Sequence, residues 1–296
     1  MIICWEKDLD MNSKTLELSA PWHDALAVLL AILSAFALVE QILTLKILLR
    51  RENRRKRLTP YLINLAVTNL LFVCSSYTLS MASYLSRRFV SSKPVCILFG
   101  YIASATVLVT FASFTASTCL VYRATKELTK QLTIARNKDV KIIMLIWFLA
   151  FAILSPMIEF WKKDSFQPGT TGCTPIRLLQ TPEDIAYFVV LTVVAFSAPM
   201  TISAVYSVKI YLFFVQVKPF QMSIFQQRKY QEYKSVSKMI IALVVVFVAC
   251  WIPHTIVSSV TLAGYPPSPE LQALLSLLSK SSVLYTPLIY AAFNNK

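Results

Sequence analysis

The chain has 296 residues, of which 56% are apolar and 15% are charged. A soluble domain carries more charge and fewer apolar residues, so this composition indicates an integral membrane protein. The formal net charge is +14, but the basic residues lie mostly between apolar segments. They therefore indicate topology and attraction to anionic lipid, and they argue against a nucleic-acid partner. With four glycines and two histidines, the chain is poorly supplied for a phosphate-cradling loop or a metal site.

Seven apolar segments are each long enough to cross a bilayer as a helix, which takes ~20 residues. We place these spans at 24–49, 58–85, 95–122, 140–161, 184–215, 238–263 and 270–292. The scarcity of glycine and the lack of strand-period alternation favour helices over a barrel. The predicted fold class is an all-α membrane protein, a seven-transmembrane helix bundle, in a single domain over residues 1–296.

Basic residues in the short loops predict the orientation of the bundle. They are dense in 50–57 after the first span, in 123–141 after the third, and in 218–238 after the fifth. The loop after the second span also holds basic residues, so the bias is not complete. We expect the dense loops and the C-terminus in the cytoplasm, the N-terminus outside, and the plasma membrane as the location.

Two of the six cysteines lie on the predicted outer side. Cys96 opens the third span, and Cys173 lies in the outer loop between the fourth and fifth spans. A disulfide persists in the oxidising environment of that side. We therefore expect a Cys96–Cys173 bridge that holds the loop over the mouth of the bundle.

Six of the seven predicted spans contain short sequence motifs. They are Gln41-Ile-Leu-Thr-Leu, Asn64-Leu-Ala-Val-Thr-Asn69, Trp147 with Pro156, Pro199 with Tyr206, Phe247-Val-Ala-Cys-Trp251-Ile-Pro253, and Thr286-Pro287-Leu-Ile-Tyr290. In this order the motifs resemble those of rhodopsin-like G-protein-coupled receptors, class A, along almost the whole chain. The sixth-span motif fully matches the family pattern Phe-x-x-Cys-Trp-x-Pro. Pro253, Pro287 and Tyr290 are then expected to belong to the family's switch motifs.

Lys280 is a lone lysine inside the seventh span. A charged amine at that depth costs ~2.5–3.5 kcal/mol even on lenient insertion scales. It can keep its charge with a partner, lose its proton, or form a covalent bond, because a desolvated amine condenses with an aldehyde to a Schiff base. Snorkelling suits it poorly, since it lies ten residues from Glu270 at the outer end.

The segment from Lys280 to Pro287 resembles that of opsins, in which a retinal-bearing lysine lies seven residues before this proline. The resemblance implies retinal as a covalent cofactor on Lys280, with Trp251, Phe247 and Phe99 beside it. Within the opsins, the motifs lean towards the neuropsin-like group.

Neither family position for the counterion of a protonated Schiff base holds an acid. Three residues after the third-span cysteine stands Phe99, and six residues before the loop cysteine stands Gln167. One expectation is an unprotonated Schiff base, which would make the pigment absorb in the ultraviolet. The alternative is that Glu159, Asp164 or a bound anion serves as the counterion.

The family's acid-Arg-Tyr triplet at the end of the third span is replaced by Leu120-Val121-Tyr122, followed by Arg123. Asn69 stands where the family has an acid, and Thr286 where it has an asparagine. This network sets the balance between two helix packings, so we expect weak or atypical coupling to a G protein.

The preferred interpretation is a retinal-binding, opsin-like photoreceptor, which is not an enzyme, with retinal, membrane lipid and a heterotrimeric G protein as partners. Three alternatives remain open. They are a retinal photoisomerase or retinal store without signalling, an opsin-like receptor for a diffusible ligand, and a receptor remnant that acts as a dimer partner.

Overall fold

A computed structural model of the chain describes residues 18–54, 56, 58–87, 93–127, 137–162, 182–217, 223–262, 265 and 267–294. Its helical elements are α1 (Ala20–Leu48), α2 (Arg51–Arg54), α3 (Thr59–Phe72), η1 (Val73–Tyr77), α4 (Thr78–Leu85), α5 (Lys93–Glu127), α6 (Asn137–Lys162), α7 (Pro182–Leu191), η2 (Thr192–Ser197), α8 (Ala198–Gln216), α9 (Ile224–Leu262) and α10 (Pro269–Asn294). The elements η1 and η2 are π-helical turns inside longer helices.

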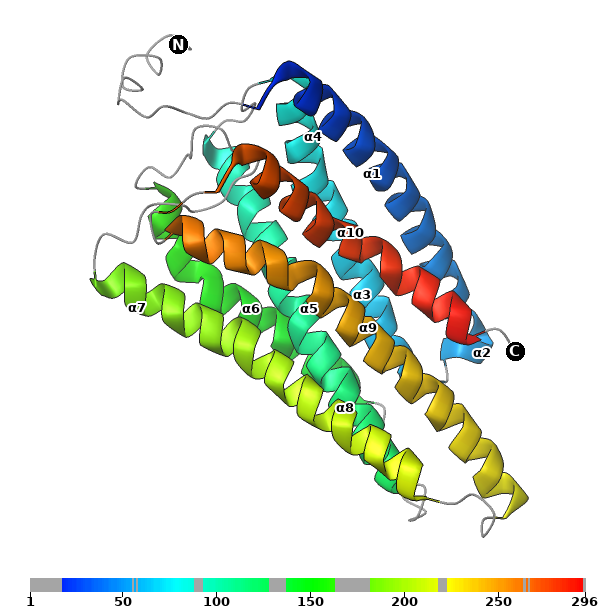
Figure 1. Cartoon of the computed structure of the whole chain (residues 1–296). Helices are drawn as coiled ribbons and strands as arrows, with labels where there is room; N and C mark the ends of the chain where they lie inside the picture. Colours follow the sequence, from blue (N-terminus) through cyan, green and yellow to red (C-terminus); the bar gives the residue numbers. More distant parts are fainter. Residues whose placement is uncertain are drawn as a thin grey trace.

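These elements form seven long rods in the described part of the chain, with α3–η1–α4 as the second and α7–η2–α8 as the fifth. The rods run side by side, and α1 begins at the end of the bundle opposite to the end of α10 (Figure 1). Six of them, among the described residues, are long and apolar enough to cross a membrane. The seventh rod, α10, has 26 residues, but polar side chains such as Ser279, Lys280 and Thr286 interrupt its apolar run.

The rods coincide with the predicted spans and mostly extend them by a few residues. The largest difference concerns α9, which begins at Ile224, whereas the predicted span began at 238. A hydropathy count finds the apolar part that lies in lipid, but the helix continues through polar residues of good helix propensity. The sixth rod therefore projects beyond the predicted membrane segment.

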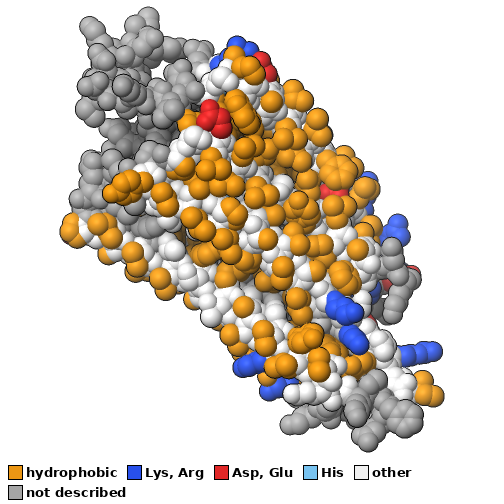
Figure 2. Space-filling model, viewed as in Figure 1, with side chains coloured by type: hydrophobic (Ala, Val, Ile, Leu, Met, Phe, Trp, Pro, Cys, Tyr) orange, Lys and Arg blue, Asp and Glu red, His pale blue; other side chains and the backbone are white. Residues whose placement is uncertain are grey.

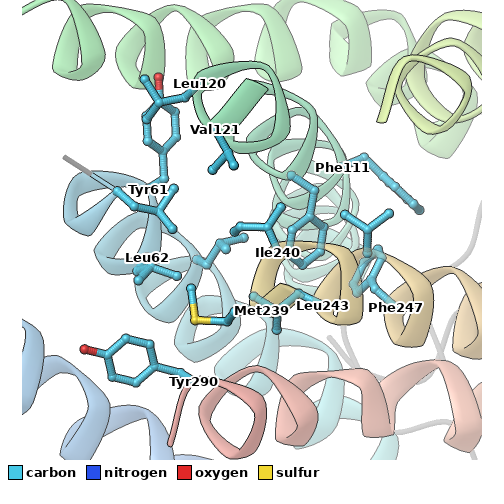
Figure 3. Packing of buried hydrophobic residues seen from close by; sticks show 14 of the residues in the cluster. Tyr61, Leu62, Phe111, Leu120, Val121, Met239, Ile240, Leu243, Phe247 and Tyr290 are labelled. Atoms are coloured by element: carbon cyan, nitrogen blue, oxygen red, sulfur yellow. The ribbon is translucent and has the colours of Figure 1, made fainter. Parts of the chain in front are cut away.

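Helix α5 lies at the centre of the bundle, in contact with α3, α6, α8 and α9. The larger core cluster gathers Tyr61 and Leu62 of α3, Phe111 of α5, and Met239 and Phe247 of α9 (Figure 3). On the outside, hydrophobic side chains cover the visible middle of the bundle, and Lys and Arg gather towards the end where α10 ends (Figure 2). This distribution is that of a protein whose middle faces lipid and whose ends face water.

Two prolines release backbone carbonyls that neighbouring side chains then satisfy. Proline has no N–H, so Pro287 leaves the carbonyl of Val283 without its helical donor. The Nε2 of Gln41, on α1 and fully buried, donates to that carbonyl over 2.9 Å. Pro156 likewise frees the carbonyl of Ala152, and the Ser155 hydroxyl donates to it over 2.8 Å.

Asn64, in the second turn of α3, joins three rods. Its amide nitrogen donates to the Ser113 hydroxyl over 2.8 Å, and its amide oxygen accepts from Trp147 Nε1 over 2.8 Å. The three residues belong to α3, α5 and α6, so one buried amide fixes the mutual register of these helices. The second-span motif and the fourth-span tryptophan thus meet in the structure.

Candidate functional site

Lys280 lies near the middle of α10, and its side chain is partly buried. The amine nitrogen donates to the hydroxyl of Ser276, one turn earlier, over 2.8 Å. The spacing of four residues puts both side chains on the same face of the helix. A neutral hydroxyl neither repels a charged amine nor compensates its charge, so among the described residues the amine has no partner of opposite charge, which a membrane cation normally finds.

Tyr77, in the π-helical turn η1, ties the second rod to the same point. Its hydroxyl donates to the backbone carbonyl of Lys280 over 2.7 Å. A π-helical turn adds a residue to the helical turn and so changes which side chains face inward after it. Tyr77 is 1% exposed, and its hydrogen bond holds the backbone at Lys280 against α3–η1–α4.

An aromatic cluster built around Trp251 of α9 lies in the same part of the bundle. The indole Nε1 donates to the hydroxyl of Ser282 on α10 over 3.1 Å. Its ring centroid lies 5.7 Å from that of Phe247, 6.1 Å from that of Phe111, and 6.2 Å from that of Phe72. Helices α3, α5, α9 and α10 thus all contribute to the surroundings of the indole. These contacts fix the indole in one orientation.

The imidazole of His254 on α9 lies close to both Trp251 and Lys280. Its imidazole centroid is 6.0 Å from the Trp251 ring, and it interacts electrostatically with Lys280. The Nδ1 atom is buried and has no hydrogen-bond partner within the described part of the chain. The neighbourhood of the amine therefore contains an unsatisfied polar atom.

No carboxylate forms an ion pair with Lys280 in the ranges that the structure describes. Phe99, at the position of the first family acid, lies near the start of α5 and is partly buried. Asp164 and Gln167 lie outside the described residues, as does the side chain of Glu159 at the end of α6. The two proposed counterions therefore stay predictions.

A cavity of ≈ 890 Å³ lies at the end of the bundle where the basic loops are. Its lining comes from the segment before α3 and from α3, α5, α9 and α10, and includes Leu62, Val121, Met239 and Tyr290. Figure 3 labels these four side chains, which come from α3, α5, α9 and α10. Val121, at the position of the family's arginine, thus presents an isopropyl group to the cavity.

The comparison with protein families matches residues 40–290 to the 7 transmembrane receptor (rhodopsin family). The chain belongs to this family. The match extends from α1 to Tyr290 of the seventh-span motif, so it includes nearly all of the bundle.

Among individual proteins, the receptor is similar to the deep-sea form of rhodopsin from Anguilla anguilla. The two are 25% identical over 285 residues, which cover 94% of this chain and 80% of that rhodopsin. It is 24% identical to pinopsin from Columba livia over 274 residues, covering 92% of this chain and 78% of the pinopsin. The crystal structure of squid rhodopsin matches with a TM-score of 0.78 at 14% identity, over 93% of this chain and 78% of that chain.

The predicted fold class and the resemblance to opsin-like class A receptors are confirmed. The receptor is a multi-pass integral membrane protein.

The neuropsin-like group stays a prediction. So does the Cys96–Cys173 disulfide, because the Cys96 side chain and Cys173 lie outside the described residues. Three other cysteines, Cys74, Cys119 and Cys250, are free thiols.

The structure brings Trp251, Phe247 and Lys280 into one region, but it distributes the switch residues over the bundle. Phe247 lies one turn from Trp251 and packs against Phe111 and Phe114 in the core. Asn69 is buried, and its amide nitrogen has no hydrogen-bond partner in the described ranges. Pro253 and Pro287 lie inside their helices, Arg123 is exposed, and Tyr122 packs partly against the core.

The sequence interpretation did not include Ser276, Ser282 or Tyr77. Ser276 could have been found, because a serine four residues before a membrane lysine lies on the same helix face. No sequence pattern identifies Tyr77, because its side chain points into the bundle only through the π-helical turn η1. Ser282 depends on how α9 and α10 pack, which hydropathy does not encode.

Proposed function

We propose that the receptor is a retinal-binding, opsin-like photoreceptor with retinal attached to Lys280 as a Schiff base. The observation that carries the proposal is the Lys280 amine, which lies in the middle of α10 with a serine hydroxyl as its hydrogen-bond partner. An amine in this environment favours its neutral, nucleophilic form. Condensation with the aldehyde of retinal forms a carbon–nitrogen double bond and releases water.

The surroundings of Lys280 fit a long apolar polyene. Trp251 and Phe247 present stacked rings with centroids 5.7 Å apart, and Phe111 adds an edge. Bound retinal supplies absorption of light and a change of shape. The protein contributes a fixed indole, held by Ser282, against which that change of shape acts. Phe99 is proposed to line the same site from the start of α5.

We further propose that the Schiff base is unprotonated in the dark and that the pigment absorbs in the ultraviolet. Phe99 and Gln167 stand at the positions of the family acids. Without a nearby carboxylate, burial disfavours the charged form of the imine. Glu159 and Asp164 are the alternative counterions, and either one would shift absorption into the visible range.

The proposed downstream step is weak or atypical activation of a heterotrimeric G protein. The cavity of ≈ 890 Å³ supports the presence of a docking cleft. Val121 lines that cavity without the arginine of the family triplet. In the orientation that the basic loops predict, the cavity faces the cytoplasm and the N-terminus lies outside the plasma membrane. A retinal photoisomerase or store is the second candidate, which the altered positions Asn69, Val121 and Thr286 favour.

The test is reconstitution of the purified receptor with 11-cis and all-trans retinal, followed by absorption spectroscopy and borohydride reduction. We expect a retinal adduct on Lys280 and a band in the ultraviolet. The Lys280→Ala variant should form no adduct, whereas Lys46→Ala, which removes an exposed lysine at the end of α1, should keep it. A wild-type receptor that takes up no retinal ends the proposal and favours a diffusible ligand.

A visible band at neutral pH would leave the retinal site intact but overturn the unprotonated Schiff base. Asp164→Asn and Glu159→Gln would then identify the counterion. Light-dependent nucleotide exchange on added G proteins separates a signalling receptor from an isomerase or store. Complete absence of exchange, together with an intact retinal adduct, would favour the second candidate.

A further inference from the structure

Two lysines from different rods converge on a pair of tyrosines where α5 packs against α8. The ring centroids of Tyr122 on α5 and Tyr206 on α8 lie 4.9 Å apart. The Lys126 Nζ lies 4.8 Å from the Tyr122 centroid, and the Lys209 Nζ lies 6.0 Å from the same centroid and 5.4 Å from that of Tyr206. We name these four residues the Lys–Tyr cluster.

The cluster gathers positive charge on a rigid platform. Tyr122 packs against the large core cluster, whereas both lysine side chains are exposed. Lys209 forms no ion pair within the described ranges, and Arg123 is exposed one residue after Tyr122. Aromatic faces attract ammonium groups, but two ammonium groups on one phenol repel each other. An anion between them would remove this repulsion.

The position of the cluster matches the depth of lipid headgroups. Helix α5 ends at Glu127 and α8 at Gln216, and both ends lie at the end of the bundle to which the Lys and Arg side chains gather (Figures 1 and 2). Tyrosines are enriched at this level of a membrane because their rings accept apolar neighbours and their hydroxyls accept water or headgroups.

We propose that the Lys–Tyr cluster binds the phosphate group of an anionic lipid in the adjacent leaflet. The two ammonium groups and the two phenol hydroxyls supply donors for phosphate oxygens. The acyl chains would lie along the apolar outer face of α8, where Val205, Val208 and Leu212 are exposed. The site is separate from Lys280 and does not depend on retinal.

Native mass spectrometry of the full receptor with phosphatidylinositol 4-phosphate tests the proposal. Each lysine near a membrane surface contributes about fivefold to the affinity for anionic lipid, so Lys126→Gln with Lys209→Gln should weaken binding about 30-fold. The matched control pair, Lys46→Gln with Lys238→Gln, removes two other exposed lysines and should leave binding nearly unchanged. Replacing both cluster lysines by arginine should keep it.

Three outcomes would overturn the proposal. An equal loss of lipid affinity in the two glutamine pairs would mean that binding depends only on the total positive charge at this end of the bundle, as expected for lysines that snorkel to the membrane surface. Binding of soluble inositol phosphate as tight as that of the lipid would assign the site to a free phosphate compound. A wild-type receptor that retains phosphatidylcholine as well as the phosphoinositide would have no anion site. Thermal unfolding of each variant verifies that it is folded.

Discussion

The hydrogen bond from Gln41 to the carbonyl of Val283 gives a sharp test of how the seventh rod is held. Gln41→Leu keeps the volume of the side chain but removes the donor, and it leaves unpaired a carbonyl that Pro287 already deprives of its helical partner. An unsatisfied buried group costs ~1–3 kcal/mol, while hydrogen bonds between membrane helices average ~0.6 and reach ~1.7 kcal/mol. We expect a loss of about 1–2 kcal/mol in unfolding free energy.

A double-mutant cycle with Pro287→Ala isolates this bond. Alanine restores an N–H at position 287, so the Val283 carbonyl regains its helical donor and no longer depends on Gln41. The double variant should therefore be more stable than the sum of the single variants predicts, by about 1 kcal/mol. Unfolding in detergent, followed by circular dichroism, measures the four proteins. Strict additivity would refute the reasoning. Thr44→Val, buried on the same helix, should combine additively with Pro287→Ala.

Three further substitutions test other parts of the structure. Tyr77→Phe removes the bond to the Lys280 carbonyl and should lower unfolding free energy by about 1 kcal/mol; an unchanged value would mean that water replaces the hydroxyl. Asn64→Leu breaks both hydrogen bonds of this buried amide at once and should lower the unfolding free energy by about 1–3 kcal/mol in the same detergent assay. An unchanged unfolding free energy would contradict the role of Asn64 in joining the three rods. Val121→Arg should raise the rate of light-dependent nucleotide exchange on a G protein. A rate below that of the wild type would show that the missing arginine is not what limits coupling.

The sequence predicts the rods well because long apolar runs have few alternatives in a membrane. Each predicted span lies within or close to a helical rod, even where the rod is interrupted by η1 or η2. Backbone groups in lipid must be paired within the segment, so an apolar run of sufficient length becomes a helix. The seventh span was predicted from its apolar length like the other six, although α10 is not among the six described rods that are apolar enough to cross a membrane.

The inward-facing side chains are much harder to predict than the rods. Lipid-facing and interior residues of a membrane helix are both apolar, so hydropathy gives little indication of which face is buried. Gln41 and Lys280 stand out in the sequence because they are polar in apolar runs. The partner of Gln41 is a backbone carbonyl, which no sequence pattern marks, and Tyr77 reaches Lys280 only because a π-helical turn precedes α4.

The segment around Lys280 is held by three other rods at nearly consecutive residues. Tyr77 of the second rod binds the carbonyl of Lys280, Trp251 of the sixth binds Ser282, and Gln41 of the first binds the carbonyl of Val283. Any ligand that strains the backbone or the side chain of Lys280 therefore acts on three helices through hydrogen bonds rather than through diffuse packing. Such bonds are made or broken, which is how a local change becomes a choice between two helix arrangements. Two of the altered family positions, Asn69 and Thr286, lie on the second and seventh of these rods, so a strain at Lys280 reaches them through the same helices that the three hydrogen bonds hold together.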